Sequence, residues 1–181
     1  MRVSCVLDTN VLVVAMAADH SSSIKADSTP VDDLALREKV LQWLQDFAES
    51  DQAWVLDHQG LIEKEYRGPR RPTKLTDQDY AILIIKEKIT LDQVRWVELD
   101  VDQHGDARLP KSLSSSVKDA ADRKMVAAVL AAAASGDDSR LVNACDTDWF
   151  DCEDALKAHG VLVEQLLDTW LRKKWRTKQS K

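Results

Sequence analysis

Short apolar segments rich in β-branched residues alternate with longer helical patterns along this chain, and such alternation is typical of a parallel α/β sheet. Strands are expected at five places: Val3–Leu7, Ala53–Leu56, Val94–Leu99, Leu141–Cys145 and Val161–Val163. Helices are expected between and after them, at Val11–Ala18, Val31–Ala48, His58–Tyr66, Asp77–Ile89, Val117–Ala134, Ala155–His159 and Glu164–Lys174. The pattern therefore predicts an α/β fold around a mostly parallel central sheet.

The length and composition of the chain fit a single folded domain. Its 181 residues suffice for one hydrophobic core, and a content of 44% hydrophobic residues argues against a disordered chain. We expect one domain over residues 1–170 and a basic C-terminal tail over residues 171–181. No membrane span or signal peptide is evident, and the three cysteines lack metal-ligand spacing. These features predict a cytoplasmic protein with free thiols.

Basic residues gather in two segments of a chain whose net charge is -6. Arg67, Arg70, Arg71 and Lys74 fall in one predicted loop, and the tail from Leu171 carries six more Lys and Arg residues and no acid. Two interpretations are open for these segments. They are arms that bind the phosphates of a nucleic acid around an acidic pocket, or they are a solvated loop and a frayed terminus.

Acidic residues follow the predicted strands at the positions where a parallel sheet forms sites. The apolar run SCVLDTNVLVVA carries one carboxylate, Asp8, at the end of the first strand. Six further acids are expected near the same edge: Glu63, Glu65, Asp119, Asp122, Asp146 and Asp148. Two carboxylates about 4 Å apart repel by on the order of 4 kcal/mol, so such a cluster indicates a divalent cation. Oxygen ligands favour Mg²⁺ or Mn²⁺, and the reaction that fits is phosphodiester hydrolysis.

Structural roles remain open for several of these residues. Asp8 could cap the helix that follows it, and Asp119 could be a first-turn acid of the alanine-rich helix. Helical geometry points Glu63 and Glu65 in different directions, so at most one of them is expected to face the pocket. Trp149, beside the acidic cluster, is a core residue or a platform on which a base stacks.

Four segments, LDTNVLV, LIEKEYR, DRKMVAAVLAA and NACDTDWF, resemble the PIN domain in order and spacing. That family consists of metal-dependent nucleases, mostly ribonucleases, and includes toxins of toxin–antitoxin pairs. The resemblance implies a three-layer α/β/α sandwich. It also implies roles for individual residues: Asp8, Glu65, Asp122 and Asp146 as catalytic acids, Asp148 as an accessory metal ligand, and Thr9 and Asn10 as supporting residues. The long segments His20–Pro30 and Asp100–Ser116 depart from the smallest members of the family.

The expected function is a metal-dependent endoribonuclease that holds Mg²⁺ or Mn²⁺ through Asp8, Asp122, Asp146 and Asp148. Its expected partners are an RNA substrate and, if it is a toxin, an antitoxin protein. The same resemblance implies a homodimer, for which the helix Asp77–Ile89 is the candidate contact surface. Two alternatives stand beside this expectation: an RNA-binding or regulatory module with little turnover, and a structure-specific DNA nuclease.

Overall fold

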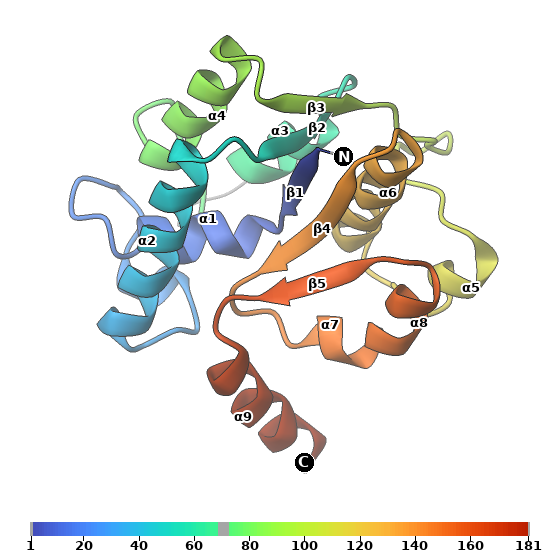
Figure 1. The fold of residues 1–181 in the computed structure, drawn as a ribbon. Helices are drawn as coiled ribbons and strands as arrows, with labels where there is room; N and C mark the ends of the chain where they lie inside the picture. Colours follow the sequence, from blue (N-terminus) through green and yellow to red (C-terminus); the bar gives the residue numbers. More distant parts are fainter. Residues whose placement is uncertain (1, 69–72, 181) are drawn as a thin grey trace.

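The computed structural model describes residues 2–68 and 73–180, and its centre is a sheet of parallel strands (Figure 1). The strands are β1 (Val3–Leu7), β2 (Ala53–Asp57), β3 (Val94–Val97), β4 (Asp138–Asn143) and β5 (Leu162–Gln165). Their order across the sheet is β3-β2-β1-β4-β5, and every neighbouring pair is parallel. The predicted α/β fold with a largely parallel sheet is confirmed.

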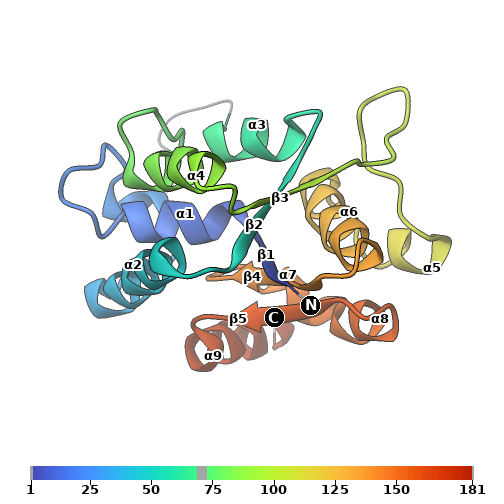
Figure 2. The same ribbon diagram turned by 45° about the horizontal axis from the view of Figure 1, so that its top comes forward.

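Helices cover both faces of this sheet. The longer ones are α1 (Thr9–Met16), α2 (Leu34–Glu49), α4 (Tyr80–Thr90), α6 (Ala120–Ala134) and α9 (Asp168–Gln179). The shorter ones are η1 (Ala26–Ser28), α3 (Leu61–Arg67), α5 (Lys111–Ser114), α7 (Asp148–Asp151) and α8 (Glu153–Ala158). Figure 2 shows α1, α2 and α4 on one side of the sheet and α6 on the other, which is a three-layer α/β/α arrangement.

The strand order explains why α6 lies apart from the earlier helices. From β1 to β3 the chain moves across the sheet in one direction, and it then returns past β1 to place β4 on the other side. Crossovers between parallel strands are right-handed, so reversing the direction moves the connecting helix to the opposite face. The reversal also creates a switch point between the carboxyl ends of β1 and β4, where sites form in open α/β sheets.

Local sequence fixes where the main helices begin. Asp33 and Asp119 precede α2 and α6, and their carboxylates accept hydrogen bonds from Ala35 N and Ala121 N at 2.9 and 2.7 Å. Asp57, at the end of β2, accepts from the backbone N–H groups of Leu61 and Ile62 at 2.8 and 2.7 Å, which starts α3. These short polar side chains satisfy backbone donors that a helix leaves free at its first turn.

Several element boundaries differ from the sequence-based predictions. Helices predicted from Val31, Asp77 and Val117 begin three residues later, because the residue before each helix, Asp33, Asp79 or Asp119, has an extended backbone. Strand β4 begins at Asp138 rather than Leu141, since pairing with β1 holds its polar first residues in the sheet. Residues 164 and 165 belong to β5, and the last helix runs to Gln179, so most of the expected basic tail is helical.

Hydrophobic side chains from β1 to β4 and from both helical layers form one core, and Val163 of β5 is partly buried against it. Strand β2 is buried at every position, as expected for a strand covered on both faces. The edge strand β5 is more exposed, with Leu162 57% accessible. Within the described part of the chain, no helix combines the length and the apolar character needed to cross a lipid bilayer.

Candidate metal centre

Three carboxylates from separate parts of the sequence converge at the switch point of the sheet. Asp8 follows β1, Asp146 follows β4, and Asp122 lies in the first turn of α6. One oxygen of each side chain lies within 4.8 Å of the other two, so this group could hold a metal ion. The sequence-based expectation that these three acids share a site agrees with this geometry.

Asp8 is the most enclosed acid of the three. Its side chain accepts hydrogen bonds from Trp149 Nε1 at 2.7 Å and from Asn10 N at 3.1 Å. Burial nevertheless raises the pKa of Asp8 from 3.8 to about 6, against the lowering effect of these two donors. The bond to Asn10 N also caps α1, so the capping role considered from the sequence coexists with a place in the cluster.

Mutual repulsion adds to burial at the other two acids. Burial, followed by the charges of Asp8 and Asp146, raises the pKa of Asp122 to about 8. Burial likewise raises the pKa of Asp146, although its bond from Asp148 N at 2.8 Å works in the opposite direction. Raised pKa values mean that the negative charges of these carboxylates destabilise one another. A divalent cation that replaces the protons would therefore bring a large electrostatic stabilisation.

Asn10 and Asn143 hold the loop that carries Asp146. Asn10 Oδ1 accepts from Ala144 N at 2.9 Å and Cys145 N at 3.2 Å, while Asn10 Nδ2 donates to Asn143 Oδ1 at 2.9 Å. Asn143 Oδ1 accepts from Asp146 N at 3.0 Å, and Asn143 Nδ2 donates to Asp146 O at 2.8 Å. These bonds tie α1 to the end of β4 and fix the backbone on both sides of Asp146.

The remaining predicted acids are not part of the three-carboxylate cluster. Glu65 accepts a hydrogen bond from Lys124 Nζ at 2.7 Å, and Glu63 pairs with Arg67 at 2.9 Å on the same helix. Asp148 is exposed and pairs with Lys178. The structure therefore brings together Asp8, Asp122 and Asp146, and it neutralises Glu65 and Asp148 with lysine side chains.

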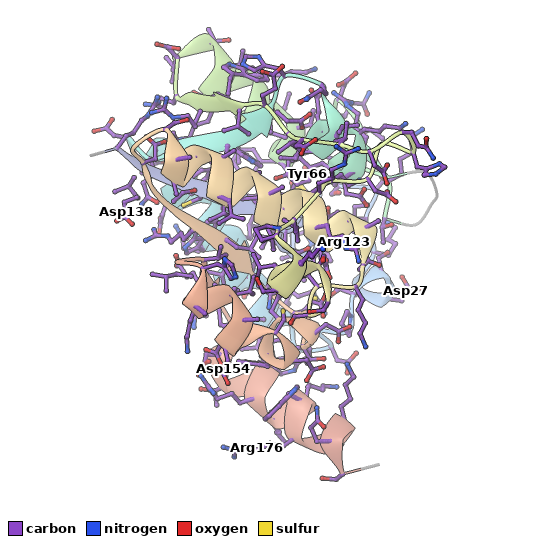
Figure 3. All side chains as sticks on the ribbon, turned by 90° about the vertical axis from the view of Figure 1, so that its right-hand side faces the viewer. Asp27, Tyr66, Arg123, Asp138, Asp154 and Arg176 are labelled. Carbon is purple, nitrogen blue, oxygen red and sulfur yellow. The ribbon has the colours of Figure 1, made fainter. Side chains whose placement is uncertain are left out.

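Helix α9 docks beside the site through its C-terminal half. Lys178 Nζ reaches Asp148, Trp175 Nε1 donates to Asp151 Oδ1 at 2.7 Å, and Gln179 Nε2 donates to the same oxygen at 3.1 Å. In Figure 3, α9 extends away from the body of the domain, and Arg176 points outward from it. Basic side chains thus lie within a short distance, along α7, of the loop that carries Asp146.

The predicted phosphate-binding loop is described only in part. Arg67 forms ion pairs with Glu63 at 2.9 Å and with Asp77 at 3.0 Å, and the Glu63 carboxylate raises the pKa of Arg67. Lys74 is exposed and lines a cavity of about 820 Å³ together with Lys124. Arg70 and Arg71 lie outside the described residues.

Trp149 and Thr9, whose roles the sequence leaves open, lie beside the cluster. Trp149 is 1% exposed, so it packs in the core rather than offering a face for stacking, and its indole N–H donates to Asp8. Its place directly after Asp148, the expected accessory acid, is the only sequence signal for this contact. Thr9 adjoins the cluster, but its hydroxyl is buried and has no hydrogen-bond partner among the described residues.

Two cavities flank the cluster. A cavity of about 620 Å³ is bounded by Asp119, Asp122 and Asp148, where α6 approaches α7. A second cavity of about 440 Å³ includes Asp8 and Asp146 in its wall. The cluster is therefore accessible from two sides, with space for a substrate that extends beyond the reacting group.

Comparison with protein-family models, with curated proteins and with solved structures finds no match to this chain. The similarity of four sequence segments to the PIN domain therefore stays an expectation. The chemistry of the site rests on the residues and distances described above.

Proposed function

We propose that this protein is a metal-dependent nuclease that cleaves RNA internally, with the three-carboxylate cluster as its catalytic centre. The convergence of Asp8, Asp122 and Asp146 within 4.8 Å carries this proposal. Three acids from three separate elements would destabilise the fold if no cation offset their repulsion. Their place at the switch point of a parallel sheet is also the place where active sites form in this class of fold.

Mg²⁺ or Mn²⁺ suits this centre best. Every ligand of the cluster is a carboxylate oxygen. Zn²⁺ and Cu²⁺ sites commonly include nitrogen or sulfur ligands, whereas Mg²⁺ and Mn²⁺ prefer oxygen. A bound ion would supply charge neutralisation and Lewis-acid activation of water and of the scissile phosphate.

The protein's own groups would hold and orient the reacting centre. Asp8, Asp122 and Asp146 would hold the cation, while the Trp149 indole fixes the orientation of Asp8 and the two asparagines fix the loop of Asp146. Water would supply the nucleophile. Ser112 Oγ does lie 2.8 Å from His159 Nε2, but this pair is at the surface, and no described carboxylate bonds to the ring. It therefore lacks the orienting acid of a hydrolytic triad.

A polyanionic substrate fits the charges around the centre. The exposed basic residues of α9 are Arg172, Lys173, Lys174, Arg176 and Lys178. On a chain with net charge -6, this local excess of positive charge attracts a phosphate backbone toward the acidic cluster. Lys74, in the loop after α3, adds an exposed cation in the wall of the cavity that it shares with Lys124.

A cleavage assay tests the proposal. Purified protein is incubated with Mn²⁺ and a fluorescent single-stranded RNA, and in parallel with single-stranded DNA and flap DNA. We expect RNA cleavage that EDTA abolishes and that Asp122→Asn reduces by at least about a hundredfold. Asp154→Asn, which removes an exposed acid of α8 outside the cluster, is the matched control and should retain activity.

Other outcomes distinguish the alternatives. Mn²⁺ binding in calorimetry together with RNA binding but no cleavage would favour a regulatory module. Preferential cleavage of flap DNA would favour a structure-specific DNA nuclease. Cleavage unchanged by Asp122→Asn would refute the assignment of the cluster as the catalytic centre.

A further inference from the structure

The cavity of about 440 Å³ whose wall includes Asp8 and Asp146 is lined mostly by residues outside the three-carboxylate cluster. Its volume falls in the range of about 300–1,000 Å³ typical of sites for small molecules or parts of them. One wall comes from the segment Ser28–Pro30, at the end of the long loop that follows α1. Another part of the wall comes from α1 itself, including Val13.

Packing and hydrogen bonds hold the loop between α1 and α2 in a fixed position. Ile24 is 3% exposed and belongs to the hydrophobic core, and Ser22 Oγ donates to the buried Asp79 carboxylate. Thr29 is 6% exposed, and its hydroxyl accepts from Val31 N at 3.3 Å. These contacts hold η1 and the residues after it in a defined position against α1.

The chemistry of the cavity suits a neutral, partly apolar group. Val13, Pro30 and Cys145 supply apolar surface, while Asp8 and Asp146 lie at the side of the metal centre. Among the described residues that line it, none carries a positive charge. The charged groups among these described residues are carboxylates, which repel an anion, so a phosphate belongs at the metal centre and an uncharged group belongs in the cavity.

Two hydroxyl groups in the wall have no hydrogen-bond partner within the described protein. Thr9 Oγ1 and Ser28 Oγ are both buried, and both residues line this cavity. A buried hydroxyl without a partner is unfavourable by about 1–3 kcal/mol. A ligand that brings donors and acceptors to these hydroxyls would relieve that deficit through a small local adjustment.

We propose that this cavity is a nucleoside subsite, which takes the base of the nucleotide adjoining the phosphate held at the metal centre. The inference rests on the proposed nuclease function for the location of that phosphate. A nucleobase has apolar faces and polar edges, which match the walls and the two hydroxyls. The subsite makes the loop after α1 a determinant of which nucleotide is placed beside the reacting bond.

Mononucleotides test the subsite without any cleavage step. In the presence of Mn²⁺, calorimetry compares the four nucleoside 5′-monophosphates with ribose 5-phosphate, which has the same phosphate and sugar but no base. We expect at least one nucleotide to bind about tenfold more tightly than ribose 5-phosphate. Ser28→Phe, which fills the cavity, should bring that ratio close to one, and Pro30→Phe should act in the same direction.

Ser23→Phe is the matched control, because Ser23 is an exposed residue of the same loop that does not line the cavity. It should keep the ratio of the native protein. Calorimetry with Mn²⁺ alone checks that each variant retains the metal centre, and circular dichroism checks that it is folded.

Equal binding of all four nucleotides and ribose 5-phosphate would overturn the subsite, as would a ratio that survives Ser28→Phe and Pro30→Phe. Failure of every nucleotide to bind would overturn it as well. The proposed function fails separately: RNA cleavage with no base discrimination would remove the subsite alone. Base discrimination without cleavage would remove the nuclease assignment and leave the subsite in place.

Discussion

Replacing Asp122 by asparagine should stabilise the metal-free protein at alkaline pH while removing its metal site. The pKa of Asp122 is raised from 3.8 to about 8 in the folded chain, so the folded state binds a proton more tightly than the unfolded state does. The free energy of unfolding contributed by this group is therefore largest below pH 3.8, and it falls as the pH rises toward about 8. Asparagine carries no charge and lacks this dependence.

The size of the effect follows from the two pKa values. A shift from 3.8 to about 8 corresponds to about 6 kcal/mol, at about 1.4 kcal/mol for each pH unit. Asp122 is only half-buried, and solvent screening reduces this figure. We expect Asp122→Asn to raise the free energy of unfolding by about 2–3 kcal/mol at about pH 8.5, and by less than about 1 kcal/mol at about pH 5.

Urea denaturation followed by circular dichroism, in EDTA at both pH values, measures these differences. Adding Mg²⁺ should reverse the order at the higher pH. A ligand at a thousand times its Kd stabilises the native protein by about 4.1 kcal/mol, which exceeds the variant's advantage of about 2–3 kcal/mol, and the variant has lost a ligand to the ion. Asp154→Asn changes the net charge equally without touching the cluster and should show neither effect. An Asp122→Asn protein no more stable than the native one at about pH 8.5 would refute the electrostatic reasoning.

Three further predictions concern the residues around the cluster. Trp149→Phe removes the donor to Asp8 and should weaken Mn²⁺ binding about tenfold in calorimetry. The loss should be larger at lower pH, because the pKa of Asp8 would rise further, and an unchanged affinity would contradict this role. Asn10→Ala removes three hydrogen bonds and should lower the free energy of unfolding by about 2–4 kcal/mol in urea, and a loss below about 1 kcal/mol would argue against it. Lys178→Glu should reduce the salt dependence of RNA binding: the slope of log binding constant against log salt concentration should fall in magnitude by about 0.7 or more. Lys25→Glu, on the exposed loop, should leave this slope unchanged.

Sequence reasoning could locate the strands and the three clustered acids because both depend on local rules. Asp8 and Asp146 follow apolar strands, and parallel strands deliver their carboxyl ends to one edge. The position of Asp122 could also be predicted, since the start of a helix that follows a strand lies near the same edge of the sheet. The alternation of strands and helices thus predicts which residues arrive at the switch point.

The side chains that contact the acidic residues could not be predicted from the sequence in the same way. The rotation of α3 relative to α6 decides whether the Glu65 carboxylate points to the cluster or pairs with Lys124. Periodicity within one helix does not specify this rotation. The contact of Lys178 with Asp148 requires the docking of α9 on α7. The sequence shows that the C-terminal segment is positively charged, but it does not show where that segment lies in the fold. The indole bond to Asp8 likewise depends on tertiary packing of a residue that sequence alone assigns to the core.

The wide separation of Asp8, Asp122 and Asp146 along the chain has a consequence for local unfolding. Strand β1, helix α6 and strand β4 must all be in place before the three oxygens can lie within 4.8 Å of one another. Partial opening of any one element therefore releases a bound ion, and binding makes each such opening less favourable. Amide hydrogens in β1, β4 and the first turns of α6 should then exchange more slowly together when metal is added, as a single cooperative unit that spans the middle of the sheet.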